Sequence, residues 1–203
     1  MPIRGLATSK TRLGAGLDPI ERRALVTELL RRTLSATRDA RSIAGTIVVT
    51  MDPAAAGMAK AHDAVGLVER APGLNEAIVA ARSVAVARGA TAVLVLPADI
   101  PAVSADALDG LVEAARSAAT TGAIAVAVVA VVPDRHDRGT NAFVVSPPAA
   151  IEPAFGDDSR RRHREAAAAA GAIHLELGGP LGFDVDTPAD LLLAVATVGR
   201  LDG

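Results

Sequence analysis

The feature that most constrains the fold of this chain is an alternation between short β-branched runs and longer segments with helical spacing. The runs at residues 44–52, 64–69 and 91–99 are typical of buried strands. Segments with apolar residues at helical spacing stand before, between and after these runs, at 18–39, 53–62, 74–89 and 104–119. Such alternation predicts an α/β fold: a Rossmann-like three-layer sandwich in which helices cover both faces of a mixed, mostly parallel sheet.

The second half of the chain continues this pattern around an unusually polar segment. A Val/Ala-rich strand is predicted up to residue 133, and the strand "NAFVVS" starts at residue 141. The segment between them, "DRHDRGT", is either the turn of a surface hairpin or a group of side chains that meets a charged ligand. Two helices, over 159–170 and from Thr187, and a strand near 172–177 complete the pattern. We expect residues 1–203 to form one domain.

Composition excludes several classes of protein. The chain has no Cys and therefore no thiolate nucleophile, disulfide or cysteine metal site. Its formal net charge of -2 argues against a nucleic-acid partner. The absence of a long apolar run and of a secretory signal argues against a membrane partner and indicates a cytoplasmic protein. The His spacing fits neither a zinc site nor a triad; we expect His136 and His163 at the surface, with a position lining the pocket as the alternative.

Acidic residues follow two predicted elements. Asp99 ends the run at 91–99, just past the carboxyl end of its apolar part "AVLVLP", and "FDVDTP" contains Asp184 and Asp186 two positions apart. Residues i and i+2 of an extended segment point to the same side, and α/β sheets bind ligands at the carboxyl ends of their strands. Carboxylates from both segments would form an oxygen site suited to Mg²⁺ and phosphates. The alternative is that Asp99 caps the next segment and Asp186 caps the last helix.

Cationic and small residues precede two predicted helices. Lys10 and Arg12 stand in a loop before the first helix, where they either hold a triphosphate or form a solvated basic loop. Gly73 and Asn75 stand at the start of the helix at 74–89. Asn75 is either a helix cap or a ligand contact.

Anion-binding residues are also expected around the polar segment. Thr140 offers a hydroxyl and Arg138 a fixed charge, while Gly156 and Ser159 stand at the start of a helix. A helix N-terminus of this kind binds anions readily. The alternative is a hairpin together with an ordinary Ser cap.

Six segments, taken in order, carry a resemblance to a known family. They are "PIRGLATSKTRL", "GLNEAI", "LPADIP", "DRHDRGTNA", "PAFGDDSRRRHR" and "GFDVDTPADL". Together they resemble the 2-phospholactate/phosphoenolpyruvate guanylyltransferases of coenzyme F-420 biosynthesis. The resemblance implies a nucleotide-diphospho-sugar-transferase-like fold and transfer of GMP from GTP to the phosphate of a small carboxylic acid, with release of pyrophosphate.

The resemblance also implies roles for individual residues. The implied metal ligands are Asp99 and Asp184, with Asp186 close by. The implied contacts to the acceptor, beside Arg138, are Thr140, Gly156 and Ser159. The implied contacts to GTP are Lys10 and Arg12 at the phosphates and Gly73 and Asn75 in the "GLN" segment. Lys10, Arg12 and Asp99 would be the catalytic residues.

One departure from the family pattern concerns the start of the fold. Family members begin with a hydrophobic strand before the basic segment, whereas here Met1 directly precedes "PIRGL". We therefore expect the first strand of the sheet to be truncated or absent.

The implied chemistry needs no general base. The second pKa of the acceptor phosphate is about 6, so this group is already a nucleophilic dianion at neutral pH. Mg²⁺ and the cationic side chains would align and neutralise the two anions. The sequence leaves the acceptor open among phosphoenolpyruvate, 2-phospholactate and 3-phosphoglycerate, and it leaves a homodimer open. The alternatives are another nucleotidyltransferase of this fold, of the molybdopterin or sugar-phosphate type, and a non-catalytic nucleotide-binding module.

Overall fold

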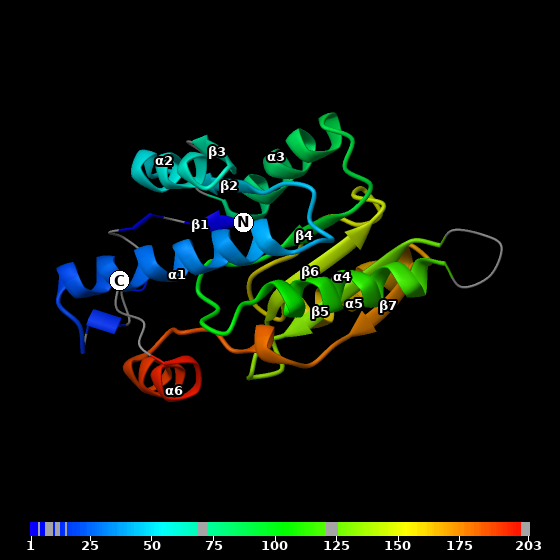
Figure 1. Ribbon diagram of the computed structural model, residues 1–203. Coiled ribbons are helices and arrows are strands. Elements are labelled where there is room, and N and C mark those ends of the chain that lie inside the picture. The colour runs from blue at the N-terminus through cyan, green and yellow to red at the C-terminus, as the bar shows by residue number, and fades with distance from the viewer. Residues whose placement is uncertain are drawn as a thin grey trace.

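A computed structural model describes residues 1–3, 5–6, 10, 13–14, 16–68, 73–120 and 126–199, and the helices and strands alternate along it as expected (Figure 1). The strands are β1 (Pro2–Ile3), β2 (Ile47–Thr50), β3 (Val65–Val68), β4 (Val93–Val95), β5 (Val128–Pro133), β6 (Thr140–Ser146) and β7 (Ile173–Glu176). The helices are α1 (Pro19–Asp39), α2 (Pro53–Ala61), α3 (Leu74–Ala87), α4 (Ala105–Ala119), α5 (Ser159–Ala169) and α6 (Pro188–Val198). Over these ranges, no helix has the length and apolarity needed to cross a membrane.

The strands form two hydrogen-bonded sheets. One is parallel, in the order β1-β2-β3, and the other is mixed, in the order β4-β6-β5-β7. In the mixed sheet β6 runs antiparallel to β4 and β5, whereas β5 and β7 are parallel. The α/β class and the mixed strand directions are therefore confirmed.

The two sheets are separate because β1, at the edge of the parallel sheet, is not paired with β4, at the edge of the mixed sheet, within the described residues. In that part of the chain, β1 pairs with β2 and with no other strand. A cavity of about 430 Å³ lies between the two sheets. Its lining includes Ile47 and Val49 from β2, Val95 from β4 and Ala81 from α3. The two sheets are thus neighbours across a largely apolar gap rather than one continuous ladder.

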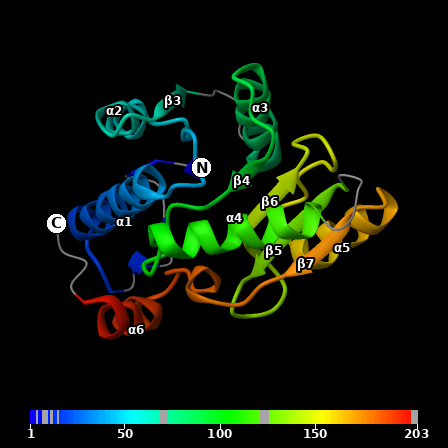
Figure 2. The ribbon, with the colours of Figure 1, turned by 45° about the vertical axis from the view of Figure 1, so that its right-hand side comes forward.

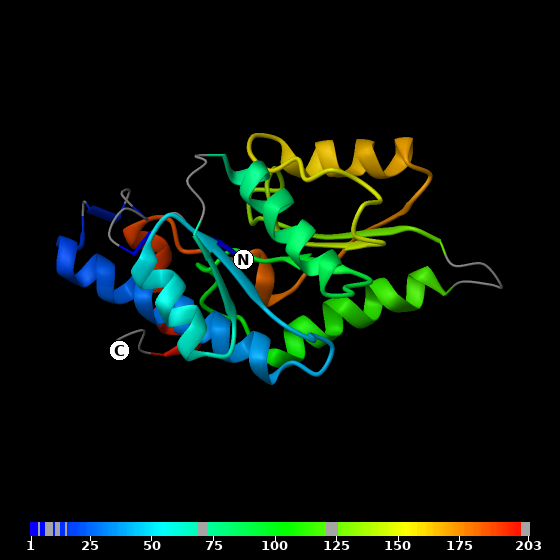
Figure 3. The ribbon, with the colours of Figure 1, turned by 90° about the horizontal axis from the view of Figure 1, so that it is seen from above.

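The alternation of side chains on β5 explains the three layers. Val128, Ala130 and Val132 pack with residues of α4 on one face of the sheet. Val129 and Val131 point to the opposite face, where they pack with residues of α3 and α5. In Figure 3, α5 lies above the strands of the mixed sheet and α4 lies below them. Both faces of β5 are therefore buried, which explains its unbroken apolar sequence.

Capping residues set the starts of the helices that border the site. Asp18 forms a capping box with Glu21 at the start of α1, and Ser104 caps α4. At α6, Thr187 is the N-cap and forms a capping box with Asp190. Leu25 and Leu29 of α1 pack with Ala194 of α6, and the two helices lie on the same side of the molecule in Figure 2.

Candidate active site

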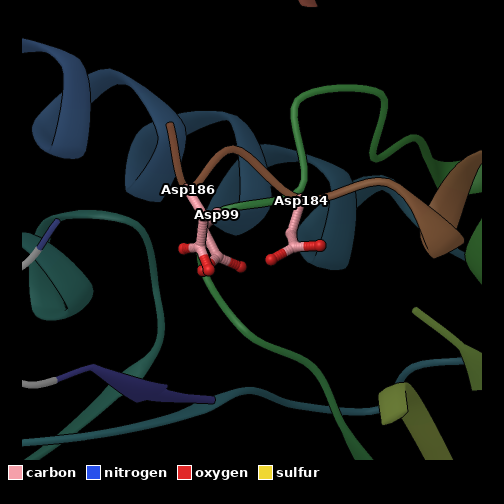
Figure 4. A group of neighbouring side chains, drawn as sticks. All are labelled: Asp99, Asp184 and Asp186. Carbon is pink, nitrogen blue, oxygen red and sulfur yellow. The ribbon is translucent and has the colours of Figure 1, made fainter. Parts of the chain in front are cut away.

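Three carboxylates meet where β4 ends and where the chain enters α6. One oxygen from each of Asp99, Asp184 and Asp186 lies within 4.8 Å of the others. In Figure 4 the three carboxyl groups are directed into the same region. Val185 is fully buried between the two neighbouring Asp residues, and its amide donates to the Asp99 carbonyl at 3.1 Å. The alternation of an extended segment and this backbone bond bring the predicted carboxylates together.

The carboxylate of Asp186 is not the cap of α6. Thr187 occupies the N-cap position, and the Asp190 carboxylate accepts hydrogen bonds from the backbone amides of Asp186 (3.0 Å) and Thr187 (2.7 Å). The alternative interpretation of Asp186 as a helix cap is therefore wrong. Because Asp190 holds the backbone at this point, the Asp186 side chain can face the other two carboxylates.

Lys10 lies directly against this acidic cluster. Its Nζ is 2.5 Å from Asp99 Oδ2 and 2.6 Å from Asp186 Oδ1. Burial alone would lower the pKa of Lys10, but the neighbouring Asp99 and Asp186 outweigh it, so the pKa is raised and the ammonium is retained. The second predicted cation, Arg12, lies outside the described residues.

The electrostatics of the cluster fit a bound divalent cation. Burial, and then the charge of Asp99, raise the pKa of Asp184, because its anion is poorly compensated. Asp99 Oδ1 is buried and has no hydrogen-bond partner among the described residues. Three carboxylates facing one ammonium leave a negative excess, and carboxylate oxygens are the ligands that hard cations prefer. Asp99, Asp184 and Asp186 are therefore the residues that could hold a metal ion.

The first part of the polar segment is the turn of the hairpin between β5 and β6. The Asp134 carboxylate accepts hydrogen bonds from the amides of His136 and Arg138, and Asp137 has a left-handed φ of 59°. His136 is exposed, as expected. Arg138 is exposed as well, and its Nε donates to Asp158 at 3.1 Å. Residues 134–139 therefore form the turn of the hairpin, and the ligand-binding role of Arg138 stays a prediction.

Asn141, at the end of the same segment, contacts the acidic cluster. Its Nδ2 donates to Asp184 Oδ1 at 3.3 Å. The pairing of β5 with β6 changes register here, because Val132 pairs with Ala142 and Pro133 with Thr140. Asn141 is thus the extra residue of a bulge, a feature that redirects a side chain beside a site. Asn141 was not among the predicted site residues, although the segment "DRHDRGTNA" contains it.

Arg135 fixes the hairpin to the segment that carries two of the carboxylates. Its guanidinium lies 2.5 Å from the buried Asp190 carboxylate and 5.4 Å from the centre of the Phe183 ring. Asp190 in turn holds the backbone of Asp186, as described above. Arg135 therefore positions the acidic segment without belonging to the cluster, and sequence reasoning missed it.

The predicted acceptor residues lie in a buried polar group around His163. Ser159 Oγ donates to Thr140 Oγ1 at 3.3 Å, and the same hydroxyl is 3.1 Å from His163 Nδ1. His163 has no exposed surface, so its expected surface position is wrong. The rings of Phe143 and Phe155 enclose it, with centroids 4.5 Å and 5.0 Å away. Burial lowers the pKa of His163 to about 4, so the ring is neutral at pH 7.

The loop before α5 has the backbone conformation that its sequence suggests. Gly156 has φ 111°, a region that disfavours side chains, and Asp158 has φ 53° and is the N-cap of α5. Ser159 is the first residue of the helix, and its hydroxyl bonds Thr140 rather than the helix amides. The alternative interpretation of Ser159 as a simple cap is therefore wrong.

The "GLN" segment lies against this loop. Gly73 is the N-cap of α3, so the interpretation of Asn75 as a cap is wrong. The Asn75 side chain instead accepts from the Phe155 amide at 2.9 Å and donates to the Phe155 carbonyl at 3.1 Å. The two segments predicted to bind different substrates are thus in direct contact.

Solved structures share this fold. A putative nucleotide-diphospho-sugar transferase from Desulfovibrio desulfuricans superimposes with a TM-score of 0.73 over 97% of this chain and 84% of its own, at 19% identity. A cytidylyltransferase from Leptospira borgpetersenii gives a TM-score of 0.60 over 96% and 84%, at 12% identity. These likenesses place the chain in a fold class that includes the putative nucleotide-diphospho-sugar transferase and the cytidylyltransferase.

Sequence relatives narrow the class. The chain belongs to the family described as CofC-like guanylyl transferases, whose model matches residues 1–196. A phosphoenolpyruvate guanylyltransferase from Sphaerobacter thermophilus is 42% identical over 94% of this chain and 88% of the relative. One from Rubrobacter xylanophilus is 36% identical over 98% and 93%. The family that the six motifs resembled is therefore confirmed, and the chain is an enzyme of the guanylyltransferase type.

Proposed function

We propose that this enzyme transfers GMP from GTP to the phosphate of phosphoenolpyruvate and releases pyrophosphate. The observation that carries the proposal is the connection between two sites through adjacent residues of β6. Asn141 bonds the acidic cluster through Asp184, while Thr140 belongs to the polar group around His163. A cation site and an acceptor site would thereby lie next to each other, as a reaction between two phosphates requires. The names of the relatives supply the acceptor.

The acidic cluster and the basic loop serve the GTP phosphates in this proposal. Asp99, Asp184 and Asp186 would hold Mg²⁺, which when bound neutralises charge on the phosphate oxygens. Lys10, which contacts two of these carboxylates, would turn its ammonium toward the leaving pyrophosphate together with Arg12. Gly73 and Asn75 would contact the nucleotide, and the Asn75–Phe155 bonds would couple that contact to the acceptor loop.

The chemical step requires alignment rather than a base. An oxygen of the acceptor phosphate forms a bond to the α-phosphorus of GTP, and the bond from that phosphorus to the bridging oxygen of pyrophosphate breaks. The dianionic phosphate brings no proton to the new bond at neutral pH, so no side chain has to remove one. Thr140, Ser159, Gly156 and Arg138 would bind the acceptor. We assign His163 no role as the base, because its pKa of about 4 makes it a weak proton acceptor and its Nε2 already accepts from the Ala154 amide.

Replacing Thr140 by Val is expected to weaken acceptor binding and leave GTP binding unchanged. Val keeps the β-branched shape but removes the hydroxyl, and losing one hydrogen bond to a charged group costs about 1.5–3 kcal/mol. The KM for phosphoenolpyruvate should rise about ten- to a hundredfold. Steady-state titrations of both substrates measure this.

The matched control is Thr33→Val, because Thr33 is also buried but its hydroxyl donates to the Leu29 carbonyl of its own helix. That variant should have the KM values of the wild type. Equal and small changes in both KM values for Thr140→Val would remove Thr140 from the acceptor site.

The location of the protein in the cell and its oligomeric state stay predictions. GTP is a cytoplasmic metabolite, which supports the predicted cytoplasmic location. A homodimer is also still a prediction, for which the exposed Leu192 and Leu193 on α6 are the first side chains to probe. Light scattering of the purified protein measures its mass in solution.

A further inference from the structure

Both ring nitrogens of His163 are engaged inside the protein. Nε2 lies 3.0 Å from the backbone nitrogen of Ala154, and Nδ1 lies 3.1 Å from Thr140 Oγ1. The side chain is fully buried, and the rings of Phe143 and Phe155 pack against it. The imidazole therefore has one orientation, with one neighbour for each nitrogen.

These neighbours determine where the ring proton is. A backbone N–H can only donate, so Nε2 must accept the bond from Ala154 and carries no proton. The lowered pKa leaves a single proton on the ring at neutral pH. That proton is on Nδ1, and His163 donates it to the hydroxyl oxygen of Thr140.

The Thr140 hydroxyl receives a second bond. Ser159 Oγ donates to the same oxygen at 3.3 Å. A hydroxyl oxygen has two lone pairs and one proton, so two incoming bonds leave only its own proton for a further partner. We propose that His163 is a positioning residue that fixes the Thr140 hydroxyl as a donor toward an anionic oxygen of the acceptor. This inference rests on the proposed acceptor site and adds what orients it.

The consequence is selectivity for charge. A free hydroxyl turns to donate or accept, whichever its partner requires, whereas a hydroxyl whose lone pairs are filled can only donate. Thr140 would then bind a phosphate or carboxylate oxygen and would offer nothing to a ligand that presents donors. His163 does not touch the acceptor; it acts through Thr140.

Two substitutions separate the two bonds of His163. His163→Asn places an amide nitrogen near the position of Nδ1 and preserves the donor to Thr140, but it cannot reach Ala154. His163→Gln places an amide oxygen near the position of Nε2 and preserves the acceptor for Ala154, but it donates nothing to Thr140. Both lose the aromatic contacts of the ring, so their thermal unfolding should be similarly lowered.

The expected kinetic results differ between the two variants. His163→Gln should raise the KM for phosphoenolpyruvate about tenfold with the KM for GTP unchanged, and His163→Asn should stay within about threefold of the wild type. In a Thr140→Val background, His163→Gln should add no further increase. If both variants raise the KM equally, or if His163→Gln has its full effect without the Thr140 hydroxyl, the inference is wrong and His163 is structural only.

A spectroscopic measurement keeps the inference separate from the proposed function. Nitrogen chemical shifts of the wild-type protein, with His163→Gln to assign the signal, report which ring nitrogen is protonated at pH 7. A protonated Nδ1 supports the inference even if the wild type uses no phosphorylated acid, which would defeat the proposed function alone. A protonated Nε2 overturns the inference whatever the enzyme transfers.

Discussion

Replacing Asp99 by Asn is expected to abolish GMP transfer in a protein that still folds. The two carboxylate oxygens of Asp99 have different surroundings. Its Oδ2 forms an ion pair with Lys10, whereas its buried Oδ1 has no hydrogen-bond partner among the described residues. Asn keeps the shape but removes the charge that a cation and the Lys10 ammonium require. Loss of a metal carboxylate removes several kcal/mol of charge stabilisation, or about a thousandfold in rate.

Pyrophosphate release from GTP and acceptor measures this loss, and circular dichroism verifies the fold. Asp106→Asn is the matched control, because Asp106 is exposed in the first turn of α4 and should tolerate the change. Unchanged pyrophosphate release by a folded Asp99→Asn protein would remove this residue from the site.

Replacing Lys10 by Met is expected to reduce turnover about a hundredfold or more. Met keeps the unbranched stem but provides no charge for the leaving pyrophosphate, and a charge-assisted contact in a shielded site is worth about 3 kcal/mol. The substitution also removes the ammonium between Asp99 and Asp186. Without metal, the three carboxylates should then repel one another and lower the melting temperature, and added Mg²⁺ should restore much of the loss.

The control for this variant is Lys60→Met, since Lys60 is exposed on α2. It should change neither turnover nor the response of the melting temperature to Mg²⁺. If Lys10→Met gains no more stability from Mg²⁺ than the wild type does, the ammonium and the cation do not share the cluster.

Most helices and strands could be predicted from the sequence, because the residues that start them act on their immediate neighbours in the chain. The helix start at Asp18 and the last helix from Thr187 follow from capping residues, which act within one turn. β4 was predicted over 91–99 but covers Val93–Val95, because its length depends on partners and only β6 pairs with it in the described part of the chain. The division into two sheets could not be predicted for the same reason, because it depends on which strands pair. A single domain stays a prediction.

The acidic cluster was predictable because each carboxylate follows a local rule. Asp99 follows β4 in the loop beyond its carboxyl end, and Asp184 and Asp186 share one side of an extended segment. His163 was misplaced because its burial depends on Phe143 and Phe155, and no local pattern says that these rings meet it.

The hydrogen bonds and ion pairs that support the site could not be predicted either, because they join residues that are distant in the sequence. The Arg135–Asp190 pair joins residues 55 positions apart in the sequence, and Asn141 reaches Asp184 only because of a bulge. Residues that position the site were therefore harder to predict than residues that form it.

The most direct test of the account is to measure pyrophosphate release by the purified enzyme with each nucleotide and each acid. Phosphoenolpyruvate, 2-phospholactate and 3-phosphoglycerate would be compared with GTP and with ATP, with and without Mg²⁺, and the product mass determined. The account predicts release that needs both Mg²⁺ and phosphoenolpyruvate, prefers GTP, and yields the guanosine diphosphate ester of the acid. Equal rates with ATP, or no release that depends on any of the three acids, would contradict it.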